Sequence, residues 1–372
     1  MTKRESNICK GIAIMLMFVH HLFFHAEWLA IELGPLFKTP EELALFAQNC
    51  KICVNIFVFI TAYGTTKSLI NDPLDNIGEV VHKILRRYIR LLLSFQFVYI
   101  IGALLCPLSG RSWFTVYSPS RLENLAFALA DFMGLSYALG LPRYNTTWWY
   151  MPLAFFLILS LPWLIKLCRR YGAYLFLPFL LLLRWVQASD MLIRYFPVAL
   201  LGILFAENQV VEKIKAGYSK TRLLVKLAVC LVCLVVIKLT GILWQRFSMG
   251  QIDIYETVLC LAVCFLTVVG VAKIPYLNRA IAFLGKYSMN MFLFHAFVYQ
   301  QWFYDFTYSF RYPALIFLFL LLSMLVFSIA VEKMKKLLRL EQLGNLLADR
   351  LCSVILRIKD RIACLKLQEA ES

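Results

Sequence analysis

Residues 312–332 read YPALIFLFLLLSMLVFSIAVE, and this stretch decides the class of fold. From Pro313 to Val331 it contains no charged residue. About twenty apolar residues in a helix are enough to cross the roughly 30 Å hydrocarbon core of a bilayer. Because backbone polar groups in lipid must be satisfied internally, such a run predicts a membrane-spanning helix. It is too long and too uniform for a barrel strand.

Similar runs recur along the whole chain, whose 372 residues are 61% hydrophobic. Soluble domains are closer to half apolar. The sequence therefore predicts an all-α integral membrane protein, a bundle of about ten transmembrane helices. We place the crossings near residues 11–31, 52–70, 91–107, 148–167, 173–188, 190–207, 223–244, 254–272, 287–303 and 312–332.

The formal net charge of +16 has a pattern that indicates topology. Nucleic-acid binding would require the basic residues to gather on a soluble domain, which they do not, so no nucleic-acid partner is expected. Instead, alternate loops are basic, which the positive-inside rule interprets as cytosolic. These loops carry Lys3, Arg4 and Lys10; Lys83, Arg86, Arg87 and Arg90; Lys166, Arg169 and Arg170; Lys213, Lys215, Lys220 and Arg222; and Lys273, Arg279 and Lys286. We expect a multi-pass protein of the inner (plasma) membrane with both termini in the cytoplasm.

Two segments need a separate interpretation. Residues 122–140 are apolar enough for a further crossing, but that crossing would invert every later loop. We therefore expect an interfacial or re-entrant helix within a long outer loop. Residues 333–372 carry apolar side chains at three- and four-residue spacing among lysines and arginines. They predict a cytosolic basic amphipathic tail, on the anionic inner leaflet or against a partner helix, after a membrane domain of residues 1–332.

The first predicted crossing carries Lys10 and His21. Eleven helical steps of about 100° return to within ~20° of the same face and rise ~16 Å. We expect Lys10 at the cytosolic surface and His21 above it inside the membrane, a separation that suits the phosphates and thioester of coenzyme A. A histidine within a membrane helix is a functional candidate, and it titrates near neutral pH as a general base must. A packing role weighs equally on these residues alone.

The neighbouring histidines are weaker candidates. His20 points ~100° away from His21, so both cannot serve one site. His25 is expected one turn beyond His21 on the same face. A His-x3-His pair can bind metal, but no third ligand is evident, so we expect no metal.

Several short motifs occur in a fixed order along the chain. They are Lys10-Gly11-Ile12-Ala13 with His21 after ten intervening residues, Phe57 to Tyr63, Arg87-Tyr88-Ile89-Arg90, Thr147-Trp148-Trp149-Tyr150, Phe196-Pro197 to Leu201-Gly202, Leu284 to Ser288, and Phe292-Leu293-Phe294-His295. In this order and spacing they resemble the acyltransferase-3 membrane proteins, over about residues 5–330. That family acylates hydroxyl groups of surface polysaccharides and related acceptors.

The resemblance implies a membrane-bound O-acyltransferase that uses acetyl-CoA and modifies a hydroxyl of a cell-surface or exported polysaccharide. It implies that Lys10, Arg87 and Arg90 hold the donor phosphates and that His21 is the general base. The chain departs from the family pattern in two places. Lys10 replaces an arginine, and residues 151–155 lack the acidic residue that many members carry, so a carboxylate that orients His21 must come from elsewhere or be absent. We also expect no fused extracytoplasmic hydrolase-like domain.

For several other residues the sequence leaves two alternative roles open. Thr61 and Trp148 are expected at the acceptor, although Trp148 also suits an interfacial aromatic belt. Ser288 and His295 lie seven residues apart on one helical face, where they either line the acceptor path or complete a hydrogen-bond network. The arginines are either phosphate ligands or topology anchors. The alternative function is a transporter or flippase, for which we find no paired halves with broken helices.

Overall fold

The computed structural model describes residues 1–35, 37–70, 77–186, 190–220 and 252–371, with scattered positions between 225 and 239. Every regular element in this part of the chain is helical. The helices are α1 (Lys3–Phe23), α2 (Pro40–Asn49), α3 (Cys53–Leu69), α4 (Ile77–Leu104), α5 (Arg121–Phe132), α6 (Tyr150–Tyr171), α7 (Phe176–Trp185), α8 (Asp190–Glu207), α9 (Val210–Lys220), α11 (Ile252–Val269), α12 (Leu277–Ala296), α13 (Tyr304–Ser309), α14 (Pro313–Leu337) and α15 (Leu340–Glu371). Short 3-10 turns separate several of them, and a π-helical turn, Phe297–Trp302, extends α12.

Among the described residues, seven helices are long and apolar enough to cross a membrane, or eight if the bent pair α8 and α9 forms one span. Ten crossings are therefore not confirmed. The predicted crossing at 223–244 falls largely outside the described residues. At 173–188 the structure has a 3-10 turn and the ten-residue α7. Ten helical residues rise only ~15 Å, about half of the hydrocarbon thickness.

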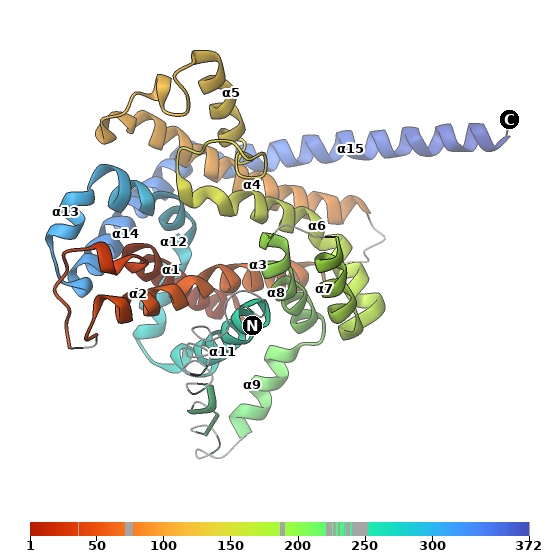
Figure 1. Cartoon of the computed structure of the whole chain (residues 1–372). Helices are drawn as coiled ribbons and strands as arrows, with labels where there is room; N and C mark the ends of the chain where they lie inside the picture. Colours follow the sequence, from red (N-terminus) through yellow and green to blue (C-terminus); the bar gives the residue numbers. More distant parts are fainter. Residues whose placement is uncertain are drawn as a thin grey trace.

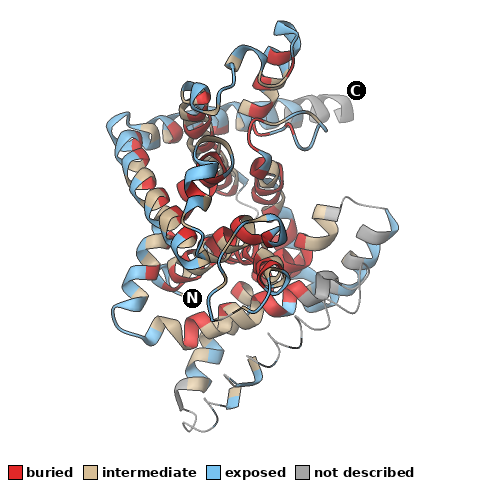
Figure 2. Cartoon of the chain, turned by 60° about the vertical axis from the view of Figure 1, so that its left-hand side comes forward, coloured by how far each residue is buried: buried red, intermediate tan, exposed pale blue. Residues whose placement is uncertain are grey.

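Helix α1 lies at the centre of the bundle and packs against α3, α12, α2, α14 and α11. The long helices α1, α3, α4 and α6 run side by side in Figure 1. Buried residues lie on the faces that the helices turn toward one another (Figure 2). The arrangement puts the helix that carries Lys10, His20 and His21 in contact with five other helices.

Helix α1 begins earlier and ends earlier than the predicted crossing at 11–31. The Thr2 hydroxyl accepts from the Glu5 backbone N–H at 3.2 Å, and the Glu5 carboxylate accepts from the Thr2 N–H at 2.7 Å. This capping box starts the helix at Lys3. Its 21 residues already rise about 31 Å by Phe23. The expectation that His25 continues the face of His21 is therefore wrong: His25 follows the helix and precedes a 3-10 turn.

The stretch predicted as non-spanning, 122–140, contains the twelve-residue α5, which is too short to cross a bilayer. Asp131 anchors it. The carboxylate accepts from the Tyr117 hydroxyl and from the Tyr144 backbone N–H, both at 2.8 Å. Tyr117 in turn lies 2.9 Å from the hydroxyl of Tyr99 on α4. Burial raises the pKa of the Asp131 carboxyl to about 6, against these hydrogen bonds, which lower it.

The tail is a helix, as its apolar periodicity predicts, and its first half packs on α4 of the same chain. Asn345 contacts Arg90 at 2.9 Å, Asp349 contacts His82 at 2.6 Å, and the Cys352 thiol lies 3.7 Å from the Gly78 carbonyl. Residue numbers rise along one helix as they fall along the other, so the two are antiparallel. Beyond this contact α15 extends away from the bundle (Figure 1).

Candidate active site

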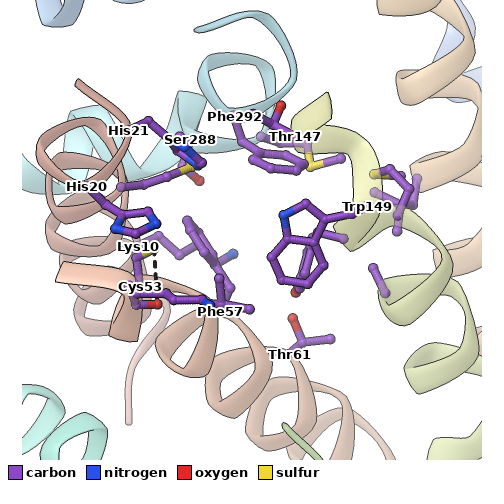
Figure 3. A pocket seen from close by; sticks show the side chains of 18 of the residues that line it. Lys10, His20, His21, Cys53, Phe57, Thr61, Thr147, Trp149, Ser288 and Phe292 are labelled. Atoms are coloured by element: carbon purple, nitrogen blue, oxygen red, sulfur yellow. Dashed lines mark hydrogen bonds between the residues drawn. The ribbon is translucent and has the colours of Figure 1, made fainter. Parts of the chain in front are cut away.

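A cavity of about 330 Å³ opens between α1, α3, α6 and α12. Its lining is mostly apolar and aromatic, with polar groups from each helix. These include Lys10, His20, His21, Lys51, Thr61, Thr147, Trp149 and Ser288. In Figure 3 the side chains of His20, Phe57, Thr61 and Trp149 surround a common space. We call this space the inner cavity.

Two cations, Lys10 of α1 and Arg87 of α4, lie near each other. Lys10 lines the inner cavity. The Arg87 guanidinium donates to the Thr65 hydroxyl at 3.0 Å and to the Ser68 hydroxyl at 3.2 Å, which fixes it against α3. Lys10 and Arg87 are close enough to repel each other. In the part of the chain that the structure describes, neither cation forms an ion pair with a carboxylate, and two such neighbouring cations favour an anionic ligand such as a phosphate.

Three histidine rings meet at the other end of α1. The ring centroids of His21 and His295 are 4.9 Å apart, and those of His21 and His20 are 5.0 Å apart. His20 is held by its Nδ1, which lies 2.8 Å from the Ala47 carbonyl oxygen. His295 is fully buried, and its Nδ1 lies 2.6 Å from the Phe292 carbonyl oxygen, so Nδ1 must be the donor. Its Nε2 then carries a lone pair, and within the described residues this atom has no hydrogen-bond partner.

A second cavity of about 360 Å³ lies beyond these histidines. We call it the outer cavity. His25, Trp28, Gln300 and Tyr304 are among the residues that line it. The two cavities share four lining residues: His20, His21, Thr147 and Trp149. His21 can therefore be reached from both sides of this shared wall.

Some of the residues predicted to bind the acceptor line the inner cavity, and others lie in the core. Thr61 and Ser288 line the inner cavity. Trp148 lies in the core instead, 2% exposed, with its Nε1 donating to the Leu293 carbonyl at 3.1 Å. Its neighbour Trp149 lines both cavities. The two residues lie in a 3-10 turn of three residues per turn, so consecutive side chains point ~120° apart.

Arg90 and His295 also lie away from the inner cavity. The Arg90 guanidinium contacts Asn345 and Glu341 of α15, each at 2.9 Å. It therefore faces the tail, whereas Arg87 faces α3. His295 contacts the ring of His21 from behind and does not line either cavity. The structure thus places Lys10 and His21 in the lining of one cavity. Arg87 lies near Lys10 but is not among the lining residues, and Arg90 faces the tail.

Lys51 is a cavity residue that the sequence pattern does not single out. It lies in a 3-10 turn before α3 and lines the inner cavity together with His20 and His21. A single lysine between two cysteines at a predicted membrane boundary gave no signal beyond topology. Within the described part of the chain, no carboxylate lines either cavity. The expected source of a carboxylate for His21 is thus not found among these lining residues.

Comparison with known proteins gives one match. A family profile described as an acyltransferase domain matches residues 4–333. No curated protein and no solved structure matches the chain. The matched region contains every residue that lines the two cavities. Together with the apolar spans, this match shows that the chain belongs to the acyltransferase-3 family and is a multi-pass membrane acyltransferase.

Proposed function

We propose that the protein transfers an acetyl group from acetyl-CoA to a hydroxyl of a cell-surface or exported glycan, with His21 as the general base. The observation that carries this proposal is the position of His21. It lies on the same helix and in the same cavity as Lys10, and in the wall that the inner cavity shares with the outer one. A base at that place has access to a donor on one side and to an acceptor on the other.

The donor fits the inner cavity from the side of Lys10 and Arg87. Their charges suit the phosphates of coenzyme A. Eleven helical steps lead from Lys10 to His21, a rise of about 16 Å, which the pantetheine arm has the length to cover. The thioester is then presented beside His21, in a mostly apolar space that excludes water from the acyl group.

The acceptor hydroxyl approaches through the outer cavity. His21 accepts its proton while the hydroxyl oxygen attacks the thioester carbon. The tetrahedral intermediate collapses with loss of the coenzyme A thiolate, which takes up the proton from His21. The products are the acetyl ester and free coenzyme A. A transient acyl-histidine is an alternative route to the same products. Trp149, which borders both cavities, offers a flat apolar face for a sugar ring.

The orientation that we propose puts the Lys10 end in the cytosol of the cell and the outer cavity at the opposite surface of the plasma membrane. The alternating loop charges support it. The N-terminus and the part of the tail that packs on α4 both lie toward the connection between α3 and α4: the Met1 ammonium contacts Tyr63 of α3 at 2.7 Å, and the Cys352 thiol contacts the Gly78 carbonyl of α4. Two such segments at the same end of a bundle favour an even number of crossings between them.

The test is replacement of His21 by alanine. Loss of a general base typically lowers the rate 10²–10⁴-fold. The assay follows radiolabelled acetyl from acetyl-CoA to surface glycan in membranes from cells that lack the native gene. Membrane abundance and acetyl-CoA affinity should remain near wild type. His82→Ala is the matched control, because His82 pairs with the exposed Asp349 and lines neither cavity. Full activity of His21→Ala at normal abundance would contradict the proposal.

A further inference from the structure

A third cavity, of about 440 Å³, lies at the corner where α14 turns into α15. We call it the corner cavity. Arg90 and Ser94 of α4 form one side of it, while Leu91, on another face of the same helix, lines the inner cavity. Helix α4 therefore separates the two spaces. The corner cavity is a site in its own right and not an extension of the candidate active site.

The lining of the corner cavity is rich in cations. It holds four, Arg90, Lys335, Lys336 and Arg339, against two carboxylates, Glu332 and Glu341. One ion pair neutralises part of this charge: Arg90 pairs with Glu341 at 2.9 Å. Lys335 donates to the uncharged amide of Asn290 at 2.6 Å, so it keeps its charge but already has a partner.

The other two of the four cations, Lys336 and Arg339, are not engaged by these contacts. Within the described part of the chain, Lys336 and Arg339 take part in no ion pair. The cavity thus has a net positive charge and two cations available to a ligand. An exposed lysine such as Lys336 is common on a protein surface and by itself does not indicate a ligand. The backbone conformation of Arg339 is unusual and needs a separate explanation.

The backbone at this corner also favours an anionic ligand. Helix α15 is 32 residues long and begins here, and Leu340, Glu341 and Gln342 of its first turn line the cavity. The start of a long helix carries partial positive charge and favours an anion. Arg339, immediately before it, has φ 54°, in the left-handed region. That conformation is strained for a non-glycine residue, and glycine is the usual residue there.

We propose that the corner cavity is a second phosphate-binding site, with Lys336 and Arg339 as the ligand-facing cations. The phosphate group belongs either to a soluble nucleotide such as coenzyme A or to the headgroup of an anionic lipid. Lys335, Lys336 and Arg339 lie beyond residue 333, so the site is largely outside the matched family domain. It goes beyond the proposed acetyl transfer and does not depend on it.

The variant that tests the site best is Arg339→Gly. It removes the guanidinium and also relieves the left-handed backbone strain, so loss of binding cannot be confused with loss of folding. Lys333→Gln is the matched control. Lys333 is exposed on the same helix end and carries the same charge, but it does not line the cavity.

Binding is measured on the purified full chain in non-ionic detergent with two probes. One is coenzyme A, compared with 3′-dephospho-coenzyme A. The other is phosphatidylglycerol, compared with phosphatidylcholine, followed by the rise in melting temperature and by native mass spectrometry. We expect Arg339→Gly to weaken the binding of coenzyme A, of phosphatidylglycerol or of both at least tenfold. The melting temperature of the variant without ligand should be unchanged or higher.

The outcomes separate the sources and can overturn the site. A selective loss of the coenzyme A response assigns a nucleotide, and a selective loss of the phosphatidylglycerol response assigns a lipid. Unchanged responses to both probes in Arg339→Gly would refute the proposal. An equal loss in Lys333→Gln would also refute it, because only net charge would then matter. Neither readout needs catalytic turnover, so the result stands apart from the test of His21.

Discussion

The contact between α1 and α12 leads to a sharp prediction about Gly285. A Cβ added at Gly285 would lie 1.8 Å from the Asn7 carbonyl oxygen and 2.9 Å from the Gly11 nitrogen. The reciprocal position behaves in the same way, since a Cβ at Gly11 would lie 2.1 Å from the Ile281 carbonyl oxygen. In both cases the obstacle is backbone, which cannot rotate aside as a side chain can. The two helices therefore touch through their glycines.

The required displacement follows from these distances. Ordinary van der Waals contact begins at 3.4 Å, so Gly285→Ala must move the two helices apart by about 1.5 Å at this point. Overpacking of this kind typically costs ~1–3 kcal/mol of stability. The same two helices carry His21 and His295, whose rings are 4.9 Å apart. A misplacement of ~1 Å can lower an enzymatic rate 10²-fold. We expect at least that loss of acetyl transfer.

The assay is acetyl transfer to surface glycan, normalised to the amount of folded protein in the membrane. Gly64→Ala is the matched control, because it is also a helical glycine and a Cβ there would meet nothing within 4 Å. It should keep wild-type activity and gain a few tenths of a kcal/mol or more from the better helix propensity of alanine. Wild-type activity and melting temperature in Gly285→Ala would show that α1 and α12 are not in this close contact.

Three further predictions concern the donor, the outer loop and the topology. Arg87→Ala should weaken acetyl-CoA binding at least tenfold in equilibrium titrations, whereas a purely anchoring role would leave the affinity unchanged. Because burial raises the pKa of Asp131 to about 6 from an ordinary value near 3.9, the folded protein binds the proton more tightly than the unfolded chain. The stability from this group is therefore greatest below about pH 4 and falls by about 3 kcal/mol as the pH rises to about 6; melting curves should show this slope, and Asp131→Asn should abolish it. On a cysteine-free background, an impermeant thiol reagent should label Leu125→Cys but not Arg350→Cys in intact cells, and the reverse pattern would invert the proposed orientation.

The sequence predicts the class of fold because bilayer thickness dictates the length of an apolar helix. The run at 312–332 becomes α14, and the periodic tail becomes α15. Hydropathy does not predict the residue at which a helix begins or the element that covers it. It places the first helix at 11–31, although the capping box at Thr2 and Glu5 starts it at Lys3. Periodicity also gives the tail an apolar stripe without saying that α4 covers its first half.

The position of candidate site residues can be predicted from the sequence where one helix carries them. A period of 3.6 residues is enough to put Lys10 and His21 in one cavity. It is not enough where the backbone changes its period, as in the 3-10 turn that sends Trp148 into the core. It also fails where partners come from distant segments. Nothing near Arg90 in the chain indicates that Asn345 and Glu341 hold it. Tertiary packing, and not local pattern, decides those positions.

The wall between the inner and outer cavities also has a bioenergetic meaning. A membrane that carries a proton-motive force must stay electrically insulated, and in the orientation that we propose the two cavities approach each other from its two sides. The side chains of His20, His21, Thr147 and Trp149 are what both hollows share. If these four residues bring donor and acceptor together as we propose, they also serve as insulation. Smaller side chains in this wall would then be expected to let water and protons pass and to allow unproductive hydrolysis of the thioester.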